Sequence, residues 1–155
     1  MDPLSWPFWQ AVGMSVLCGG IIGVDRELHD KPAGLRTCIL VSLGSMLFVR
    51  LGSQLDGPAA DPTRVLGQVI TGIGFLGAGV ILARGHSVRG VTTAGTVWVL
   101  AAIGAMIGLD QHSAAFAVTA VVSLVLVLLG PISNRLSAKT AEHHPDDTVN
   151  RPPGS

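Results

Sequence analysis

Five apolar segments, each close to the length that a helix needs to cross a bilayer, constrain this chain more than any other feature of its sequence. A helix that spans the hydrocarbon layer requires about 20 mostly apolar residues. The segments are Phe8–Val24, Thr37–Ser53, Val65–Ala83, Val91–Leu109 and Ser113–Gly130. The sequence therefore predicts an all-α fold, a polytopic membrane bundle of about five transmembrane helices in residues 1–130.

The composition agrees with lipid as the main solvent. Charged residues make up 13% of the chain and hydrophobic residues 48%, whereas a soluble domain usually carries about a quarter charged residues. Ten basic and ten acidic residues balance without a basic block, so the expected partner is the lipid bilayer and not nucleic acid. Cys18 and Cys38 lie in apolar segments, which predicts buried thiols rather than a disulfide or a zinc site. No metal or cofactor is predicted.

The distribution of basic residues predicts the orientation in the membrane. They gather after the first and third segments and at the start of the tail: Arg26, Lys31, Arg36, Arg84, Arg89, Arg135 and Lys139. The connections on the other side hold Arg64 alone. Because cytoplasmic loops retain positive charge, we expect the N-terminus outside and the C-terminus in the cytoplasm.

Proline and aspartate mark two expected helix boundaries. Asp61 followed by Pro62 is a favourable start for the third helix, and Pro131 after Gly130 is expected to end the fifth. Residues 131–155 are polar and rich in proline, and cannot bury enough apolar area to order themselves. We expect them to form a disordered cytoplasmic tail.

Glycines at helical spacing predict close contacts between helices, because small residues let helix backbones approach in lipid. The expected packing residues are Gly19 and Gly23 in the first segment, Gly72, Gly74, Gly77 and Gly79 in the third, and Gly104 and Gly108 in the fourth. The third segment carries glycines on more than one face, so it is expected at the centre of the bundle. Its G-x-G-x-x-G spacing lies inside an apolar segment, not between a strand and a helix, and does not predict a nucleotide site.

The connection between the first two segments, residues 25–37, concentrates charge at the membrane surface. Asp25 and Glu27 end the first helix and Arg36 begins the second, and helix dipoles disfavour both placements. One interpretation is a salt-bridged hairpin, in which Asp25 or Glu27 pairs with Arg36. The other is a polar functional site on the cytoplasmic face, to which Arg84 and Arg89 contribute from the next loop on that side. The sequence leaves both open.

Three stretches of the sequence resemble the MgtC/SapB family of bacterial inner-membrane proteins. They are GGIIGVDRELHDKPAGLRTCILVSLGS, DPTRVLGQVITGIGFLGAGVIL and GHSVRGVTTAGTVWVLAAIGAMIGL, in unbroken order from Gly19 to Leu109. The acidic-Arg-Glu motif of the family matches Asp25–Glu27, and its K-x-A-G-L-R-T motif matches Lys31–Thr37. Its G-I-G-F-L-G-A-G run matches Gly72–Gly79, and its R-G-[LV]-[NT]-T-A motif matches Arg89–Ala94.

The resemblance implies a regulatory inner-membrane protein tied to growth in low magnesium and to survival inside host cells. In studied relatives this link runs through a regulatory effect on the rotary ATP synthase and the membrane potential. The resemblance therefore implies that complex, another membrane protein or a second copy of the chain as an expected partner. The expected functional cluster comprises Asp25, Arg26, Glu27, Lys31, Arg36, Thr37, Arg84, Arg89, Thr92 and Thr93. Longer members of the family append a cytoplasmic ACT-like domain, whose functions are not carried over here. Some virulence-associated members carry Asn where this chain has Thr92.

Two further expectations concern single polar residues within the segments. Arg50, near the outer end of the second segment, is expected to reach the lipid headgroups. Thr92 and Thr93 are expected to cap the fourth helix, although one of them could line a pocket below the charged connection.

No nucleophile–base pair or metal triad stands out, so the chain is not predicted to be an enzyme. A rival function is a small cation channel or transporter, for magnesium or protons. No acidic residue lies at mid-membrane in any segment, and coupling ions usually bind there.

Overall fold

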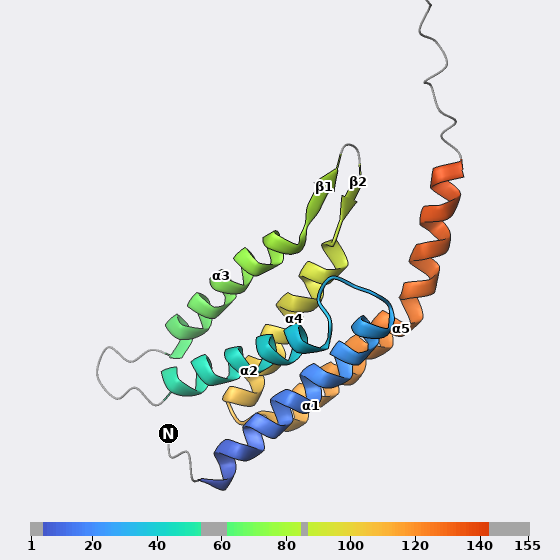
Figure 1. Cartoon of the computed structure of the whole chain (residues 1–155). Coiled ribbons are helices and arrows are strands. Elements are labelled where there is room, and N and C mark those ends of the chain that lie inside the picture. The colour runs from blue at the N-terminus through green and yellow to red at the C-terminus, as the bar shows by residue number, and fades with distance from the viewer. Residues whose placement is uncertain (1–4, 54–61, 85–86, 143–155) are drawn as a thin grey trace, which may run out of the picture. The chain divides into compact units, whose positions relative to one another are not determined.

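The computed structural model describes residues 5–53, 62–84 and 87–142, and describes the backbone alone at 62, 82–84, 87–89 and 131–142. The elements are α1 (Trp6–Leu28), α2 (Leu35–Gly52), α3 (Pro62–Val80), β1 (Leu82–Arg84), β2 (Ser87–Arg89), α4 (Val91–Gly108) and α5 (His112–Glu142) (Figure 1). Each of the five helices is long and apolar enough to cross a membrane. The predicted five-helix, all-α fold is confirmed.

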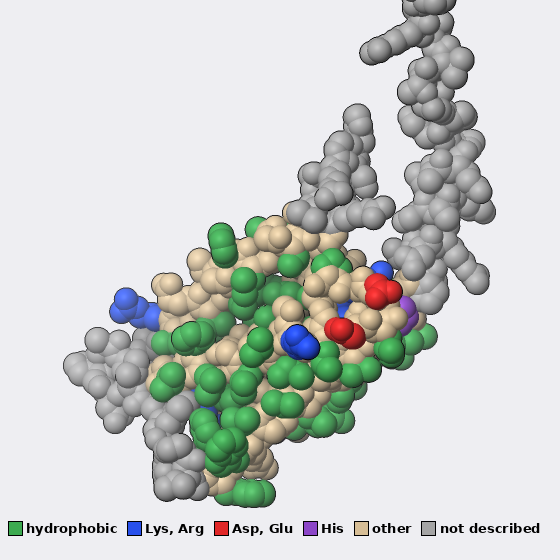
Figure 2. All heavy atoms as spheres, viewed as in Figure 1, with side chains coloured by type: hydrophobic (Ala, Val, Ile, Leu, Met, Phe, Trp, Pro, Cys, Tyr) green, Lys and Arg blue, Asp and Glu red, His purple; other side chains and the backbone are tan. Residues whose placement is uncertain are grey.

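The chain divides into two compact units, Met1–Ser123 and Leu124–Ser155. The first unit holds α1 to α4 and the beginning of α5. Large apolar side chains are exposed on every helix, among them Trp9, Leu40, Phe75, Trp98 and Leu128. Figure 2 shows hydrophobic side chains over much of the face drawn, with the acidic groups gathered toward one end. Lipid, and not water, is the solvent in which such a surface is stable.

Glycines bring α1 and α4 into close contact with α2. A Cβ atom added at Gly19 would lie 2.8 Å from the Ile39 Cα, and one at Gly23 would lie 2.8 Å from the Leu35 Cα. Further along α2, toward its C-terminal end, a Cβ atom at Gly108 of α4 would lie 2.8 Å from the Met46 backbone oxygen. These approaches are closer than side chains permit, so α1, α2 and α4 form the compact part of the bundle.

The expected central position of the third helix is wrong for this chain. In the candidate spans, 56% of the α4 residues are buried, compared with 6% of the α3 residues. Gly72, Gly74 and Gly79 would meet nothing within 4 Å if they carried a Cβ atom, whereas Gly77 lies against Ala94 of α4. Most glycines of α3 therefore face outward from the single chain. Spacing shows which face a glycine occupies, but not whether another helix covers it.

A short hairpin, which the sequence analysis did not anticipate, joins α3 to α4. The third helix ends at Val80 instead of continuing to Ala83, and β1 pairs with β2 in antiparallel register, with Ala83 opposite Val88. Gly90 then starts α4 with a φ of 92°, and a Cβ atom there would collide with the Val80 backbone oxygen. This position requires glycine.

The expected caps of α4 are also wrong. The N-cap residue is Gly90, which has no side chain with which to cap the helix. Thr92 and Thr93 lie inside the first turn, where the Gly90 backbone oxygen already accepts the hydrogen bond from the Ala94 nitrogen. Neither threonine is therefore the N-cap residue.

The boundary predicted for the fifth helix needs correction as well. The helix does not stop at Pro131 but continues to Glu142. Proline removes one backbone hydrogen bond, but the residues that follow it (ISNRLSAKTAE) include several good helix formers. Residues 131–142 are thus helical rather than a disordered tail, and residues 143–155 lie outside the described part. The start of α3 at Pro62 is confirmed, while its predicted cap, Asp61, is outside the described residues.

Candidate functional site

The charged motifs meet at one end of the first unit, where residues 29–34 connect α1 to α2 and where the β1–β2 hairpin lies. We call it the motif end. At the opposite end, which we call the far end, α2 finishes and residues 109–111 turn from α4 into α5 (Figure 1). α1 continues to Leu28, so Asp25, Arg26 and Glu27 belong to its last two turns and not to a loop.

Arg26 points into the bundle, although it was expected in a surface connection. The residue is 2% exposed, and its Nη2 atom donates a hydrogen bond to the Thr93 hydroxyl of α4. Its Nε atom is buried without a hydrogen-bond partner among the described residues. Thr93 is itself 2% exposed. This contact ties α1 to α4 and brings together two members of the predicted cluster that are 67 positions apart.

Glu27 organises the start of α2. Its Oε2 atom accepts a hydrogen bond of 2.9 Å from the Leu35 backbone nitrogen, which is one of the unpaired donors of the first helical turn. Gly34, the N-cap residue, carries no side chain that could perform this task, and a Cβ atom there would collide with the Glu27 carboxylate. A negative charge at a helix N-terminus also interacts favourably with the helix dipole. The placement of Glu27 that looked unfavourable for α1 is therefore favourable for α2.

The predicted salt bridge to Arg36 is not formed. Asp25 instead faces His29 one turn later, with 3.3 Å between its Oδ1 atom and the His29 Nδ1 atom. Within the described residues, no ion pair joins Arg36 to Asp25 or Glu27. The two helices are held in register by the Glu27 cap and by the close approach of Gly19 and Gly23.

The remaining members of the predicted cluster divide into two groups. Lys31, Arg36, Thr37 and Thr92 are exposed. Arg84 and Arg89 are strand residues at the motif end, where the structure describes their backbone only. The structure thus joins Arg26 to Thr93 and Glu27 to the α2 N-terminus. It leaves two cations, Lys31 and Arg36, on the surface of the same end.

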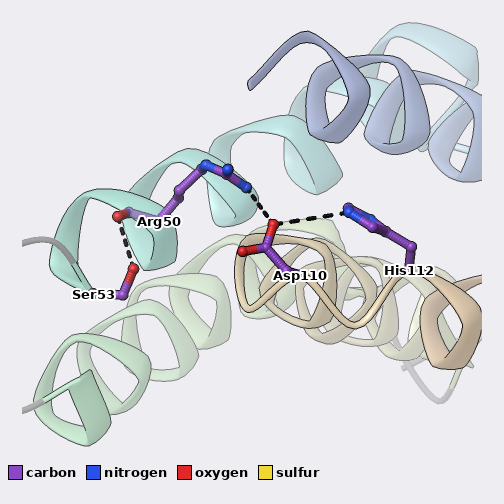
Figure 3. A network of polar contacts seen from close by, with 4 residues as sticks. All are labelled: Arg50, Ser53, Asp110 and His112. Atoms are coloured by element: carbon purple, nitrogen blue, oxygen red, sulfur yellow. Dashed lines mark hydrogen bonds and ion pairs between the residues drawn. The ribbon is translucent and has the colours of Figure 1, made fainter. Parts of the chain in front are cut away.

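A second polar cluster, which the sequence analysis missed, lies at the far end (Figure 3). The Arg50 Nη1 atom donates a 2.7 Å hydrogen bond to the Asp110 Oδ1 atom. His112 approaches the same oxygen at 3.8 Å through its Nε2 atom, and the Ser53 hydroxyl donates to the Arg50 backbone oxygen at 3.0 Å. Asp110 holds a φ of 61°, a conformation that aspartate adopts more readily than most residues.

The expectation that Arg50 reaches the headgroups is wrong, since the residue is 9% exposed and paired. A buried charge in a membrane bundle is tolerated when a partner of opposite sign is at hand. One feature of the sequence could have predicted this pair: Arg50 lies inside one apolar segment and Asp110 follows another, and both are expected on the same side of the membrane. That signal does not show which two helices are neighbours.

The residues described by the structure include no group of three His, Cys, Asp or Glu side chains able to hold a metal ion. Cys18 and Cys38 are free and buried, as predicted. The Cys38 thiol donates to the Ala33 backbone oxygen at 3.7 Å, which supports the α1–α2 connection.

Comparison with known proteins agrees with this arrangement. The MgtC family model matches residues 12–135. A Brucella abortus protein named Protein MgtC is 44% identical over 116 residues, which cover 75% of this chain and 48% of the relative. Protein MgtC of Salmonella typhimurium is 39% identical over 134 residues, which cover 86% of this chain and 57% of the relative.

The chain thus spans about half the length of the curated relatives that it matches. No solved structure matches it. The family match covers α2, α3 and α4 completely and includes both the Arg26–Thr93 contact and the Arg50–Asp110 pair. With five apolar helices and a match over most of its length, this chain is a multi-pass membrane protein and belongs to the MgtC family.

Proposed function

We propose that this chain is a non-enzymatic regulatory protein of the bacterial inner membrane that acts in adaptation to low magnesium. It would do so by touching another membrane complex, of which the rotary ATP synthase is the leading candidate, through its motif end. Membership of the MgtC family supports the magnesium link. The basic residues of the motif end support a cytoplasmic position for this surface.

The observation that carries the proposal is the structural use of the family motif. Arg26 donates a hydrogen bond to Thr93 inside the bundle, and Glu27 accepts one from the first turn of α2. These two contacts order the connection between α1 and α2, and Lys31 and Arg36 are exposed on the surface of this connection and the start of α2. A rigid, charged and exposed surface suits recognition of a partner, because little conformational entropy is lost on binding.

The packing of the bundle weighs against the alternative, a cation channel or transporter. A permeating ion needs polar ligands or water along its path. The contacts of Gly19 and Gly23 with α2, and of Gly104 and Gly108 with α2, bring backbones together and leave little room for water between α1, α2 and α4. The described residues also lack a cluster of acids or histidines suited to a metal ion.

Site-specific photocrosslinking in cells of the native host tests the proposal. A photoreactive amino acid at position 31 samples the motif end, and the same residue at position 111 samples the far end as the matched control. Both native residues are exposed. Subunits of the ATP synthase or of another membrane complex should be captured from position 31 and not from position 111. Equal capture from both positions, or no membrane partner from position 31, argues against the proposal.

Flux measurements separate the two candidate functions. Purified protein in liposomes should move neither magnesium nor protons faster than empty vesicles do. Flux above that background would favour the transporter.

The predicted orientation has its own test. Lys31→Cys should be protected from a membrane-impermeant thiol reagent in intact cells, and Gln111→Cys should be labelled. The native cysteines are buried and should contribute little background.

A further inference from the structure

A groove of about 590 Å³ lies between α2 and α3. Its walls are mostly apolar, and it extends along α2 from Thr37 to Phe48. Gly44 on one wall and Gly72 on the other would each meet nothing within 4 Å if they carried a Cβ atom. The groove is therefore widened by two residues without side chains, whereas glycines elsewhere bring α1, α2 and α4 close together.

The groove is closed toward the far end and open toward the motif end. Gly52 of α2 packs against Val65 of α3, with 2.5 Å between the Val65 Cγ2 atom and the position of an added Cβ atom. From that contact the two helices separate toward the motif end (Figure 1). The stretch from Thr37 to Phe48 corresponds to about 16 Å along a helix. That length is close to one leaflet, since the whole hydrocarbon core is about 30 Å thick.

Positive charge stands at the open end of the groove. Arg36 precedes the lining residue Thr37, is exposed, and takes part in no ion pair among the described residues. Lys31, also exposed, belongs to the connection that leads into α2. In contrast, the residues that line the groove are mostly apolar, such as Leu40, Ile73 and Leu76. The groove is apolar along about one leaflet and has cations at its open end. These properties are complementary to an amphiphile with an apolar chain and an anionic head.

We propose that this groove is a binding site for one anionic phospholipid. An acyl chain would lie between α2 and α3, and the phosphate would pair with Arg36. A helix of a second copy fits less well, because a spanning helix requires contact across the whole bilayer and the groove ends where Gly52 meets Val65. The bound lipid would fill the space beside α3, a helix that the rest of the chain buries very little.

Native mass spectrometry of the full chain tests the site, with palmitoyl-oleoyl phosphatidylglycerol and the corresponding phosphatidylcholine as probes. The unmodified protein should retain one phosphatidylglycerol. Gly44→Leu and Gly72→Leu each place a side chain in the groove and should abolish this retention. Gly74→Leu is the matched control, because Gly74 also faces open space on α3 but does not line the groove. Arg36→Gln should reduce the preference for phosphatidylglycerol about fivefold, the effect of one cation at a membrane surface.

A second measurement uses the unmodified protein, so its result does not depend on whether the variants fold. Vesicles of phosphatidylglycerol with a photoreactive acyl chain should label peptides from 37–48 and 65–76 above the level of other exposed helix faces. Retention that survives both glycine substitutions, or labelling spread evenly over all helices, would overturn the proposal. Gln68 is a polar residue that lines the groove. A dimer that persists without lipid and is lost in Gln68→Leu would assign the groove to a second copy instead.

Discussion

Among the side chains that the structure describes, two arginines are buried, Arg26 near the motif end and Arg50 near the far end, and they are compensated in different ways. Arg50 has a carboxylate partner, Asp110, and this pair joins the end of α2 to the turn after α4. Arg26 has a neutral partner, the Thr93 hydroxyl, and keeps one buried donor without an acceptor among the described residues. The ion pair at the far end, which we call the clamp, thus joins two parts of the bundle with both charges compensated.

The motif end retains a charge that stability alone does not explain. A buried ion that is incompletely satisfied weakens a protein, whereas an apolar side chain of similar size usually does not. Residues of this kind are expected where function requires them. We therefore expect Arg50 to serve folding and Arg26 to serve the activity of the motif end. Four substitutions test this difference.

The largest expected effect is that of Asp110→Asn. It leaves the Arg50 guanidinium without a counter-charge, and because Asp110 is itself 64% exposed we expect a loss of at most about 3 kcal/mol, the lower limit for a fully buried pair. Chemical denaturation in mixed micelles should show this loss of stability. Arg50→Leu is the control and should cost less, because the remaining Asp110 side chain is 64% exposed and can be hydrated. Equal losses for the two variants would contradict the clamp.

Thr93→Val should have the next largest effect. It keeps the shape of the residue but removes the oxygen that accepts from Arg26, and a lost hydrogen bond to a charged group costs about 2 kcal/mol. The same denaturation measurement applies. Thr93→Ser should restore most of the stability, since serine offers the same acceptor. If Thr93→Val behaves as the unmodified protein does, the contact between α1 and α4 is not energetically important.

A smaller loss is expected for Glu27→Ala. Removal of a helix cap costs about 1 kcal/mol, and the first turn of α2 should become more mobile. Hydrogen exchange of the backbone amides at 35–38 measures this locally. Asp25→Ala is the matched control, because Asp25 contacts His29 of its own connection and no donor of α2. Faster exchange in both variants to the same extent would remove the specific role of Glu27.

The smallest change in stability is expected for Arg26→Met. The new side chain has a similar length and no charge to desolvate, so denaturation should be unchanged or slightly harder. The motif end should nevertheless lose its activity, measured as crosslinking from position 31 and as growth in low magnesium. A variant that is stable and fully active would show that the two ends do not differ in the way proposed.

Several features of the fold could be read from the chain without its structure. The five helices, the start of α3 at Pro62 and the close helix packing at Gly19 and Gly23 follow from local patterns, although the patterns do not name α2 as the partner. In lipid a backbone must satisfy its own hydrogen bonds, so a long apolar segment has few alternatives to a helix. The burial of both cysteines follows from the same segments.

Other features depend on which helices become neighbours. The position of α3 at the side of the bundle, the pairing of Arg50 with Asp110 and the contact of Arg26 with Thr93 each join residues far apart in the chain. The glycine pattern of α3 was equally compatible with the centre and the edge. Capping preferences predicted Thr92 and Thr93 at the start of α4. The N-cap residue is instead Gly90, because the turn after the hairpin requires a positive φ that glycine accommodates.

By itself the sequence determined that this chain is a membrane bundle of the MgtC family, because apolar length and motif order are local properties. The tertiary structure alone decided which charges are buried, which helix is peripheral and where the groove opens. The reason is physical. Lipid solvates apolar side chains as well as a neighbouring helix does, so hydrophobicity selects the spans but not their partners. Partners are chosen by close backbone approach and by the pairing of polar groups across the bundle.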